Sequence, residues 1–217
     1  MRICLVSDRQ RLGRALNCPP REWGDLLVAQ VAAASQAGID YVQIREADLE
    51  AGDLARLVRR CLEATRRTAT RVLVNDRLDV AIACGAGVQL KERSARPVDV
   101  RRVARAGVLI GASVHTTAGV ETRKGADLLI AGTVRPTASK PGVEYLDEDG
   151  LRAIVRVADG LQVLGIGGLN VDSIPLLKAS GAAGMAAVGA FIPGAHEELR
   201  TFVQNRVTDL RFAFDSA

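Results

Sequence analysis

Residues 161–170 read LQVLGIGGLN, and residues 184–192 read GMAAVGAFI. Each stretch starts with a short, largely apolar run, typical of a strand that is buried on both faces. Glycines follow each run, and a helical pattern follows the glycines. Glycine lets a ligand approach the backbone closely, and the free N–H groups at a helix start suit a phosphate. Tight turns alone are the alternative explanation, but glycines at both places favour a phosphate site.

Similar aliphatic runs recur along the chain, about one in every 27 residues. Amphipathic segments with helical spacing separate them, such as residues 54–62, where apolar side chains share one face. Strand and helix alternating eight times predict an α/β protein with a compact (β/α)8 TIM barrel, one domain over residues 1–217. A doubly wound open sheet is the structural alternative. The predicted strands are 3–7, 41–44, 72–74, 88–90, 108–114, 128–131, 161–166 and 185–188.

The composition narrows the classes of function. Apolar residues make up 48% of the chain and charged residues 25%, a balance that excludes wholesale disorder. The formal net charge is +4, but the basic residues are scattered and only 3% of residues are aromatic, so we expect no nucleic-acid partner. The four cysteines lack metal-binding or redox spacing. Without a signal-like segment or a membrane span, we expect a cytoplasmic protein.

Two stretches read as long polar loops, residues 8–23 after the first predicted strand and residues 132–146 after the sixth. In a (β/α)8 barrel the loops that follow the strands form the active-site face. We therefore expect both loops to contribute to a site. The oligomeric state is left open by the sequence, a homo-oligomer included.

Polar residues stand where the predicted strands end. Alternation along the second strand puts Gln43 and Arg45 on one face, so both can point into the barrel mouth. Arg45 and Lys140 would suit an anionic ligand such as pyrophosphate. The other polar residues at these ends are Glu46, Asn75, Asp76, Ser113, His115, Arg135, Thr137 and Ser139.

Two of these residues have competing explanations. Asp76 is the one carboxylate that we consider as a magnesium ligand, although an N-cap for the helix starting at residue 77 is the favoured alternative. His115 is more typical of a hydrogen-bonded residue at a strand end than of a catalytic base. The second histidine, His196, is expected on the surface at the start of the last helix.

Seven motifs in order resemble the thiamine phosphate synthase and TenI superfamily. The resemblance covers roughly residues 40–192 and implies a (β/α)8 barrel that acts on thiamine precursors. In the synthase reaction, pyrophosphate leaves hydroxymethylpyrimidine pyrophosphate with magnesium, and the nitrogen of a thiazole phosphate traps the pyrimidine methylene cation. The motifs are YVQIRE (41–46), VNDRLDVA (74–81), GVQL (87–90), IGASVHT (110–116), AGTVRPTASKPG (131–142), GIGGLN (165–170) and GAAGMAAVGAF (181–191).

The resemblance implies roles for residues at the pyrimidine end of the site. Gln43 and Ser113 would contact the pyrimidine ring. Arg45, Asn75 and Lys140 would hold the pyrophosphate. Of these five, Arg45, Lys140 and Ser113 are the predicted catalytic residues, and Gln43 and Asn75 the predicted substrate-binding ones.

At the other end of the site, the resemblance implies that Thr137 and Ser139 bind the thiazole. Asp76 would be the magnesium ligand, and Mg²⁺ the implied cofactor. The backbone would cradle the thiazole phosphate at Gly167, Gly168, Gly189 and Ala190.

Three positions depart from the family patterns. The synthase pattern has a lysine where this chain has Ala47, and a second magnesium carboxylate where it has Ser94. The tautomerases of the TenI branch have an acid–base histidine where this chain has Thr133, and threonine cannot shuttle a proton near neutral pH.

Because the GVQL and SVH motifs look closer to the TenI branch, the leading prediction is a TenI-like enzyme. It would bind a thiazole phosphate and carry out tautomerase-like proton transfer. The alternative is a thiamine phosphate synthase that condenses the two precursors. A second alternative is a non-catalytic binder of phosphorylated thiazole or pyrimidine precursors. All three readings share small-molecule ligands and involve neither nucleic acid nor membrane.

Overall fold

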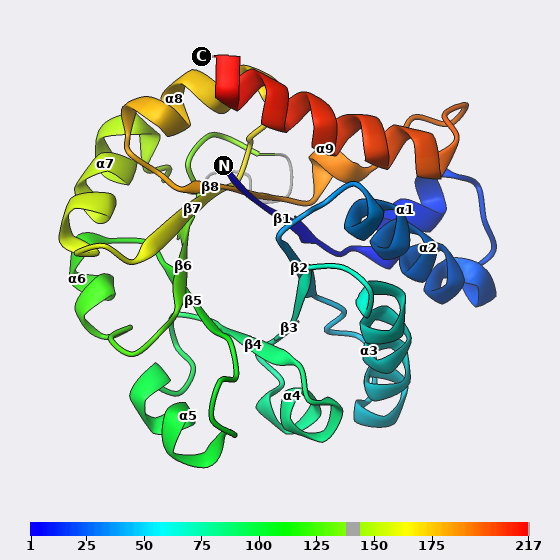
Figure 1. The fold of residues 1–217 in the computed structure, drawn as a ribbon, viewed down its shortest axis with the longest axis horizontal. Coiled ribbons are helices and arrows are strands. Elements are labelled where there is room, and N and C mark those ends of the chain that lie inside the picture. The colour runs from blue at the N-terminus through cyan, green and yellow to red at the C-terminus, as the bar shows by residue number, and fades with distance from the viewer. Residues whose placement is uncertain (138–143, 217) are drawn as a thin grey trace.

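The computed structural model describes residues 1–137 and 144–216, and within them eight parallel strands close into a barrel (Figure 1). Each strand pairs with the next along the chain, and β1 pairs with β8 to close the ring. The predicted (β/α)8 barrel is confirmed, and the open-sheet alternative is wrong. The strands are β1 Arg2–Val6, β2 Tyr41–Ile44, β3 Arg71–Asn75, β4 Gly87–Leu90, β5 Ile110–Val114, β6 Leu128–Gly132, β7 Gln162–Ile166 and β8 Gly184–Ala187.

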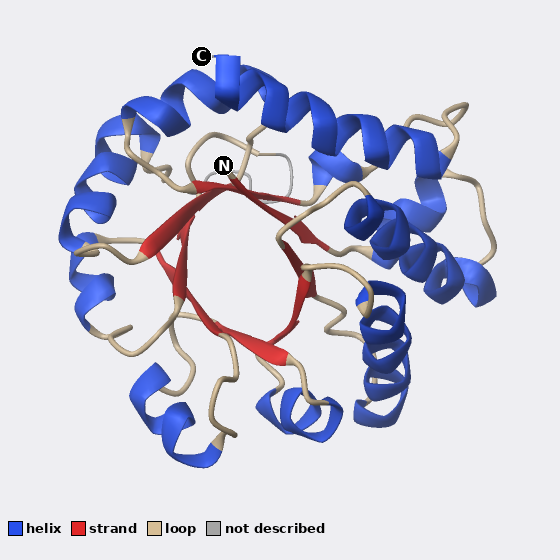
Figure 2. Cartoon of the chain, viewed as in Figure 1, coloured by secondary structure: helices blue, strands red, loops and turns tan. Residues whose placement is uncertain are grey.

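Helices surround the barrel as an outer ring (Figure 2). The long C-terminal helix packs between α8 and α2, so the two ends of the chain meet on one side of the ring. The α-helices are α1 Arg9–Ala15, α2 Trp23–Gln36, α3 Ala51–Thr65, α4 Leu78–Cys84, α5 Pro97–Val103, α6 Thr117–Glu121, α7 Asp147–Val157, α8 Ile174–Ala179 and α9 Leu199–Ser216. Three short 3₁₀ turns are η1 Pro20–Glu22, η2 Val171–Ser173 and η3 Gly189–Phe191.

Alternation along each strand divides the core into two clusters. On β1, Cys4 and Val6 point into the barrel, whereas Ile3 and Leu5 pack outward against the helices. The inner cluster is aliphatic and small, with Leu73, Leu109, Leu128, Ile130, Leu164 and Ala186 as its other buried members. Because both faces of every strand are covered, the strands read in the sequence as continuous apolar runs.

Several strand ends lie one or two residues from their predicted positions, and two predictions for the segments outside the strands are wrong. Residues 8–23 are not a loop, since they contain α1 and η1, and the side chain of Asp8 caps α1 by accepting a hydrogen bond from the Arg11 N–H. The turn η3 follows β8 directly, and the next helix, α9, starts at Leu199. Exposed His196 therefore lies in a turn between η3 and α9 and does not begin the last helix. Because residues 8–23 are mostly polar, the sequence pattern did not reveal the short helix α1, whose outward face is charged.

The inner cluster generates a stability prediction. Leu164 is fully buried inside the barrel, so Leu164→Ala should lower the free energy of unfolding by about 2–5 kcal/mol through lost burial and a residual cavity. Val103, which is 66% exposed at the end of α5, provides the control, and Val103→Ala should change it by less than about 0.5 kcal/mol. Equal effects in urea denaturation would contradict the assignment of Leu164 to a packed interior.

Candidate active site

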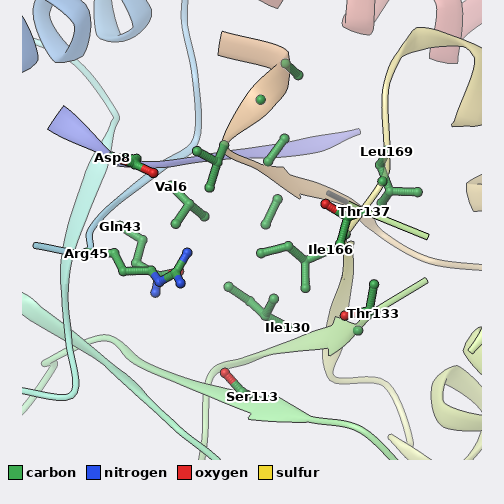
Figure 3. Close-up of a pocket in the computed structure, with 18 of the residues that line it drawn as sticks. Val6, Asp8, Gln43, Arg45, Ser113, Ile130, Thr133, Thr137, Ile166 and Leu169 are labelled. Atoms are coloured by element: carbon green, nitrogen blue, oxygen red, sulfur yellow. The ribbon is translucent and has the colours of Figure 1, made fainter. Parts of the chain in front are cut away.

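A cavity of about 1500 Å³ opens at the carboxyl ends of the strands. Its wall takes residues from the end of every strand or from the segment that follows it. In this fold that end of the barrel is where the active sites of known enzymes lie. Figure 3 shows the side chains that converge on the cavity.

The inward-facing side chains give the cavity one polar and one apolar side. Figure 3 shows Arg45 and Gln43 reaching in from one side, toward Ile130 and Ile166. The polar side comes from the ends of β2, β3 and β5, and the apolar side from β6, β7, β8 and β1. The polar residues are Gln43, Arg45, Asn75 and Ser113, and the apolar residues are Ile130, Ile166, Ala186 and Val6. Such a cavity suits a heteroaromatic ligand that carries a charged group.

Hydrogen bonds fix the polar side. The Gln43 side-chain N–H donates to Asn75 Oδ1 at 2.9 Å, and that of Gln89 donates to Ser113 Oγ at 3.2 Å. The Gln43 Oε1 atom is buried and accepts no hydrogen bond from any described residue. A buried acceptor without a donor is costly, so this atom favours a ligand that brings an N–H group.

Arg45 is positioned by a buried polar network at the start of α1. The backbone N–H of Arg45 donates to Ser7 Oγ at 2.8 Å, and the Ser7 hydroxyl donates to Glu46 Oε1 at 2.5 Å. Glu46 also accepts from the backbone N–H of Arg9, at 3.1 Å, and from its guanidinium, at 2.9 Å. These contacts join the end of β2 to the loop after β1, so the backbone that carries the Arg45 side chain is held in place.

The ionised groups of this network have shifted pKa values. Burial raises the pKa of the Glu46 carboxyl, and the hydrogen bonds from Ser7 and Arg9 oppose the rise. The guanidinium of Arg9 forms two hydrogen bonds to Asp48 and lowers the pKa of that carboxyl to about 2. Arg9 therefore stays fully engaged with acidic partners and does not offer its charge to the cavity.

Four other guanidinium groups on the cavity wall are available to a ligand. The side chains of Arg11, Arg45, Arg93 and Arg206 form no hydrogen bond or ion pair with any described residue. The buried Nε of Arg206 also has no acceptor, although its guanidinium stacks on Phe202. Unpaired guanidinium groups around one cavity favour an anionic ligand.

The acidic residues of the wall do not neutralise these arginines. Asp8 caps α1, Glu197 accepts from the Gly194 N–H at 2.6 Å, and Glu92 accepts from His115. Each carboxylate is thus occupied elsewhere. Within the described part of the wall, four unpaired arginines, together with Lys91, which pairs with Asp76, face three engaged carboxylates.

The predicted phosphate cradle also lines the cavity, at Gly167, Gly168, Gly189 and Ala190. Their backbone N–H groups form no hydrogen bond with any described residue. Backbone donors that are left unpaired beside unpaired guanidinium groups suit a phosphate.

The protein's own backbone requires glycine at position 168, whether or not a ligand binds there. Its φ is +65°, and a Cβ there would lie 2.5 Å from the carbonyl oxygen of Pro136. The loop after β6 is thereby packed tightly against the end of β7, where the Arg135 N–H donates to the Gly167 carbonyl at 3.1 Å. The tight-turn explanation therefore holds for this glycine, together with its place on the cavity wall.

The favoured alternative for Asp76, an N-cap, is wrong. Residue 77 is the N-cap of α4, and no side chain caps that helix. The Asp76 carboxylate instead accepts a hydrogen bond from Ser94 and lies 3.0 Å from Lys91 Nζ. Burial raises the pKa of this carboxyl, but the hydrogen bonds from Ser94 and Lys91 outweigh that effect and keep it below the usual value.

His115 has the strand-end contact that we favoured for it. Its Nδ1 lies 2.6 Å from Glu92 Oε2, and both residues line the cavity. A carboxylate on Nδ1 fixes the imidazole orientation and tautomer. Glu92 lies two residues before Ser94, the position of the second family carboxylate, so it does not align with that acid.

Four cationic wall residues were missed in the sequence. Lys91 and Arg93 directly follow β4, and the rule applied to the other strand ends would have found them. Arg11 lies in the stretch read as a loop. Arg206 lies in α9, far along the chain from any strand end, and no local pattern marks it.

The remaining predicted residues fall into three groups. Ser139 and Lys140 lie outside the described residues. Thr137 lines the cavity, as does Thr133 at the position of the tautomerase histidine. Ala47 is exposed and does not line the cavity.

The fold and the cavity define a class of protein, a (β/α)8 barrel with a cationic site at the carboxyl ends of its strands. A family model described as thiamine monophosphate synthase matches residues 16–191. A protein of Geobacter sulfurreducens is 36% identical over 93% of this chain and 92% of its own length. The thiamine-phosphate synthase of Pyrococcus abyssi is 34% identical over 82% of this chain and 88% of its own.

A solved structure agrees with these matches. The thiamine phosphate pyrophosphorylase from Pyrococcus furiosus superimposes with a TM-score of 0.77 at 26% identity, over 99% of this chain and 96% of that one. The chain therefore belongs to the thiamine monophosphate synthase family, and the prediction of an enzyme of this family is confirmed. The matches do not distinguish the TenI branch. No helix in the described ranges is both long and apolar enough to cross a membrane.

The cradle can be tested at Gly189, where a Cβ would meet only the tip of the Arg11 side chain, at 3.3 Å. Gly189→Leu should weaken binding of a thiazole phosphate at least ~10-fold in calorimetry, because the side chain would enter the space of the ligand. Gly24→Leu is the matched control, since nothing lies within 4 Å of a Cβ there. Unchanged affinity in a folded Gly189→Leu variant would rule out a phosphate at this place.

Proposed function

We propose that the chain is a thiamine phosphate synthase that joins hydroxymethylpyrimidine pyrophosphate to a thiazole phosphate. The observation that carries this proposal is the pair of anion-binding features on one cavity wall, Arg45 on the polar side and the glycine cradle after β7 and β8. A condensation of two phosphorylated precursors needs two such places. The names of the curated relatives support the same reading.

The polar side would take the pyrimidine pyrophosphate. The unpaired Oε1 of Gln43 suits an amino group on the ring, and Ser113 can donate its hydroxyl because its oxygen accepts from Gln89. The guanidinium of Arg45 would bind the pyrophosphate and stabilise the negative charge that builds as the C–O bond breaks. We propose the same role for Lys140.

The opposite side would hold the thiazole phosphate. The N–H groups of Gly167, Gly168, Gly189 and Ala190 would bind its phosphate, with Arg11 above Gly189 as a further cation. Thr137 and Ser139 would contact the ring. The apolar side chains of Ile130 and Ile166 line the same cavity, and the thiazole nitrogen would meet the pyrimidine methylene carbon against them. Holding both partners there supplies proximity and excludes water from the cation.

The TenI-like reading is less well supported at one residue. Thr133 lines the cavity where the tautomerase pattern has a histidine, and an alcohol is too weak an acid and too weak a base for general acid–base catalysis near neutral pH. His115 with Glu92 is the one imidazole on the described wall, so a proton-transfer activity would have to use that pair. A cytoplasmic location stays a prediction from the sequence.

The proposal predicts a specific product. The purified chain, given both precursors, should form thiamine phosphate and pyrophosphate, measured by mass spectrometry. Arg45→Met should lower the rate ~10²–10³-fold because the leaving group loses its guanidinium. Arg59→Met is the control, since Arg59 is exposed on α3, away from the cavity wall.

Three outcomes separate the readings. Product that depends on Arg45 supports the synthase. If NMR detects isomerisation of the thiazole phosphate and no condensation, the TenI-like activity is established instead. Saturable thermal stabilisation by the precursors with no turnover would establish the non-catalytic binder.

A further inference from the structure

We propose that the ammonium group of Lys91 takes the place of the magnesium ion that the family resemblance implies, so that this chain binds pyrophosphate without a metal. The inference rests on the proposed function, in which pyrophosphate is the leaving group. It concerns the segment between β4 and α5, which the assigned substrate contacts do not use.

The Asp76 carboxylate, the one nominated magnesium ligand, is already occupied. Its Oδ1 accepts a hydrogen bond from the Ser94 hydroxyl, and its Oδ2 lies 3.0 Å from Lys91 Nζ. A magnesium ion needs near-octahedral oxygen ligands. An ammonium group beside the carboxylate repels a second cation and competes for the same oxygen.

No other acid replaces the missing ligands. Glu92, which is close in sequence, is paired with His115 at 2.6 Å. Within residues 1–137 and 144–216, no cluster of three or more His, Cys, Asp or Glu side chains could hold a metal ion. Magnesium is usually held by one or two carboxylates together with waters and substrate phosphates. Among the described residues the one candidate carboxylate, Asp76, is paired with Lys91 and Ser94, so the donor set does not fit magnesium.

Lys91, by contrast, is placed to meet an anion. Lys91 and Arg93 line the cavity together with Arg45, whereas Asp76 does not line it. The Lys91 side chain is 59% exposed, so the ammonium can keep its contact with Asp76 and still donate to a ligand. Its three N–H donors provide for both contacts.

Asp76 and Ser94 then act as positioning residues for Lys91. The carboxylate holds the ammonium at the wall, and the Ser94 hydroxyl satisfies the second carboxylate oxygen. A cation that is part of the protein supplies the charge that a bound metal would otherwise bring to the departing pyrophosphate.

Calorimetry with inorganic pyrophosphate on the full chain tests this. Binding in EDTA and in magnesium chloride should agree within about threefold. Lys91→Met should weaken binding in EDTA ~10-fold or more, the loss expected for one charge-assisted hydrogen bond. Lys124→Met is the matched control, since Lys124 pairs with Glu121 at the end of α6, off the cavity wall.

A second variant rebuilds the metal site. Lys91→Met combined with Ser94→Asp removes the ammonium and places two carboxylates together. This double variant should bind pyrophosphate at least ~10-fold more tightly with magnesium than in EDTA. Circular dichroism melting verifies that each variant is folded.

The proposal is overturned if wild-type binding disappears in EDTA, if Lys91→Met binds equally well there, or if pyrophosphate binds in neither buffer. Its failure can be told apart from failure of the proposed function. Condensation with magnesium-dependent pyrophosphate binding keeps the synthase and discards the role of Lys91. If pyrophosphate binding requires Lys91 and no metal, but the chain catalyses no condensation, the role of Lys91 is kept and the synthase is discarded.

Discussion

The barrel closes where β1 pairs with β8, and that pairing requires a residue without a side chain at position 184. A Cβ on Gly184 would overlap the backbone oxygen of Arg2, its partner across the seam. Closure brings the carboxyl ends of all eight strands around one mouth, so Arg45 near β2 and Gly189 after β8 share one cavity although they are distant in sequence. A sheet left open at this seam would separate Arg45 on the polar side from the glycines after β7 and β8.

The chemistry that follows from closure depends on which charges are left unpaired. Arg9 gives its charge to Glu46 and Asp48, whereas Arg11 and Arg45 keep theirs for the cavity. An ion pair that is satisfied inside the protein contributes to structure, and a guanidinium facing a cavity without a partner contributes to binding. The same distinction applies to the backbone, where the N–H groups of Gly167, Gly168, Gly189 and Ala190 form no hydrogen bond with any described residue.

The sequence predicted the barrel, and it predicted strand-end residues that the structure brings to one cavity, because both follow local patterns. Two-faced burial makes each strand a continuous apolar run, and alternation places Gln43 and Arg45 toward the mouth. What failed depends on tertiary contacts. The partners of Asp76 are 15 and 18 residues away, so a cap and a buttressed carboxylate look alike in the sequence. Arg206 reaches the wall only because α9 packs across the closing seam.

In the proposed reaction, two phosphate-bearing ligands bind at opposite sides of one barrel mouth. A crystal structure of the protein with thiazole phosphate and pyrophosphate together measures this most directly. We expect two separate densities, pyrophosphate against Arg45 and Lys91, and the thiazole phosphate on the N–H groups of Gly168 and Gly189. Both ligands at a single place, or either one bound outside the cavity, would contradict it.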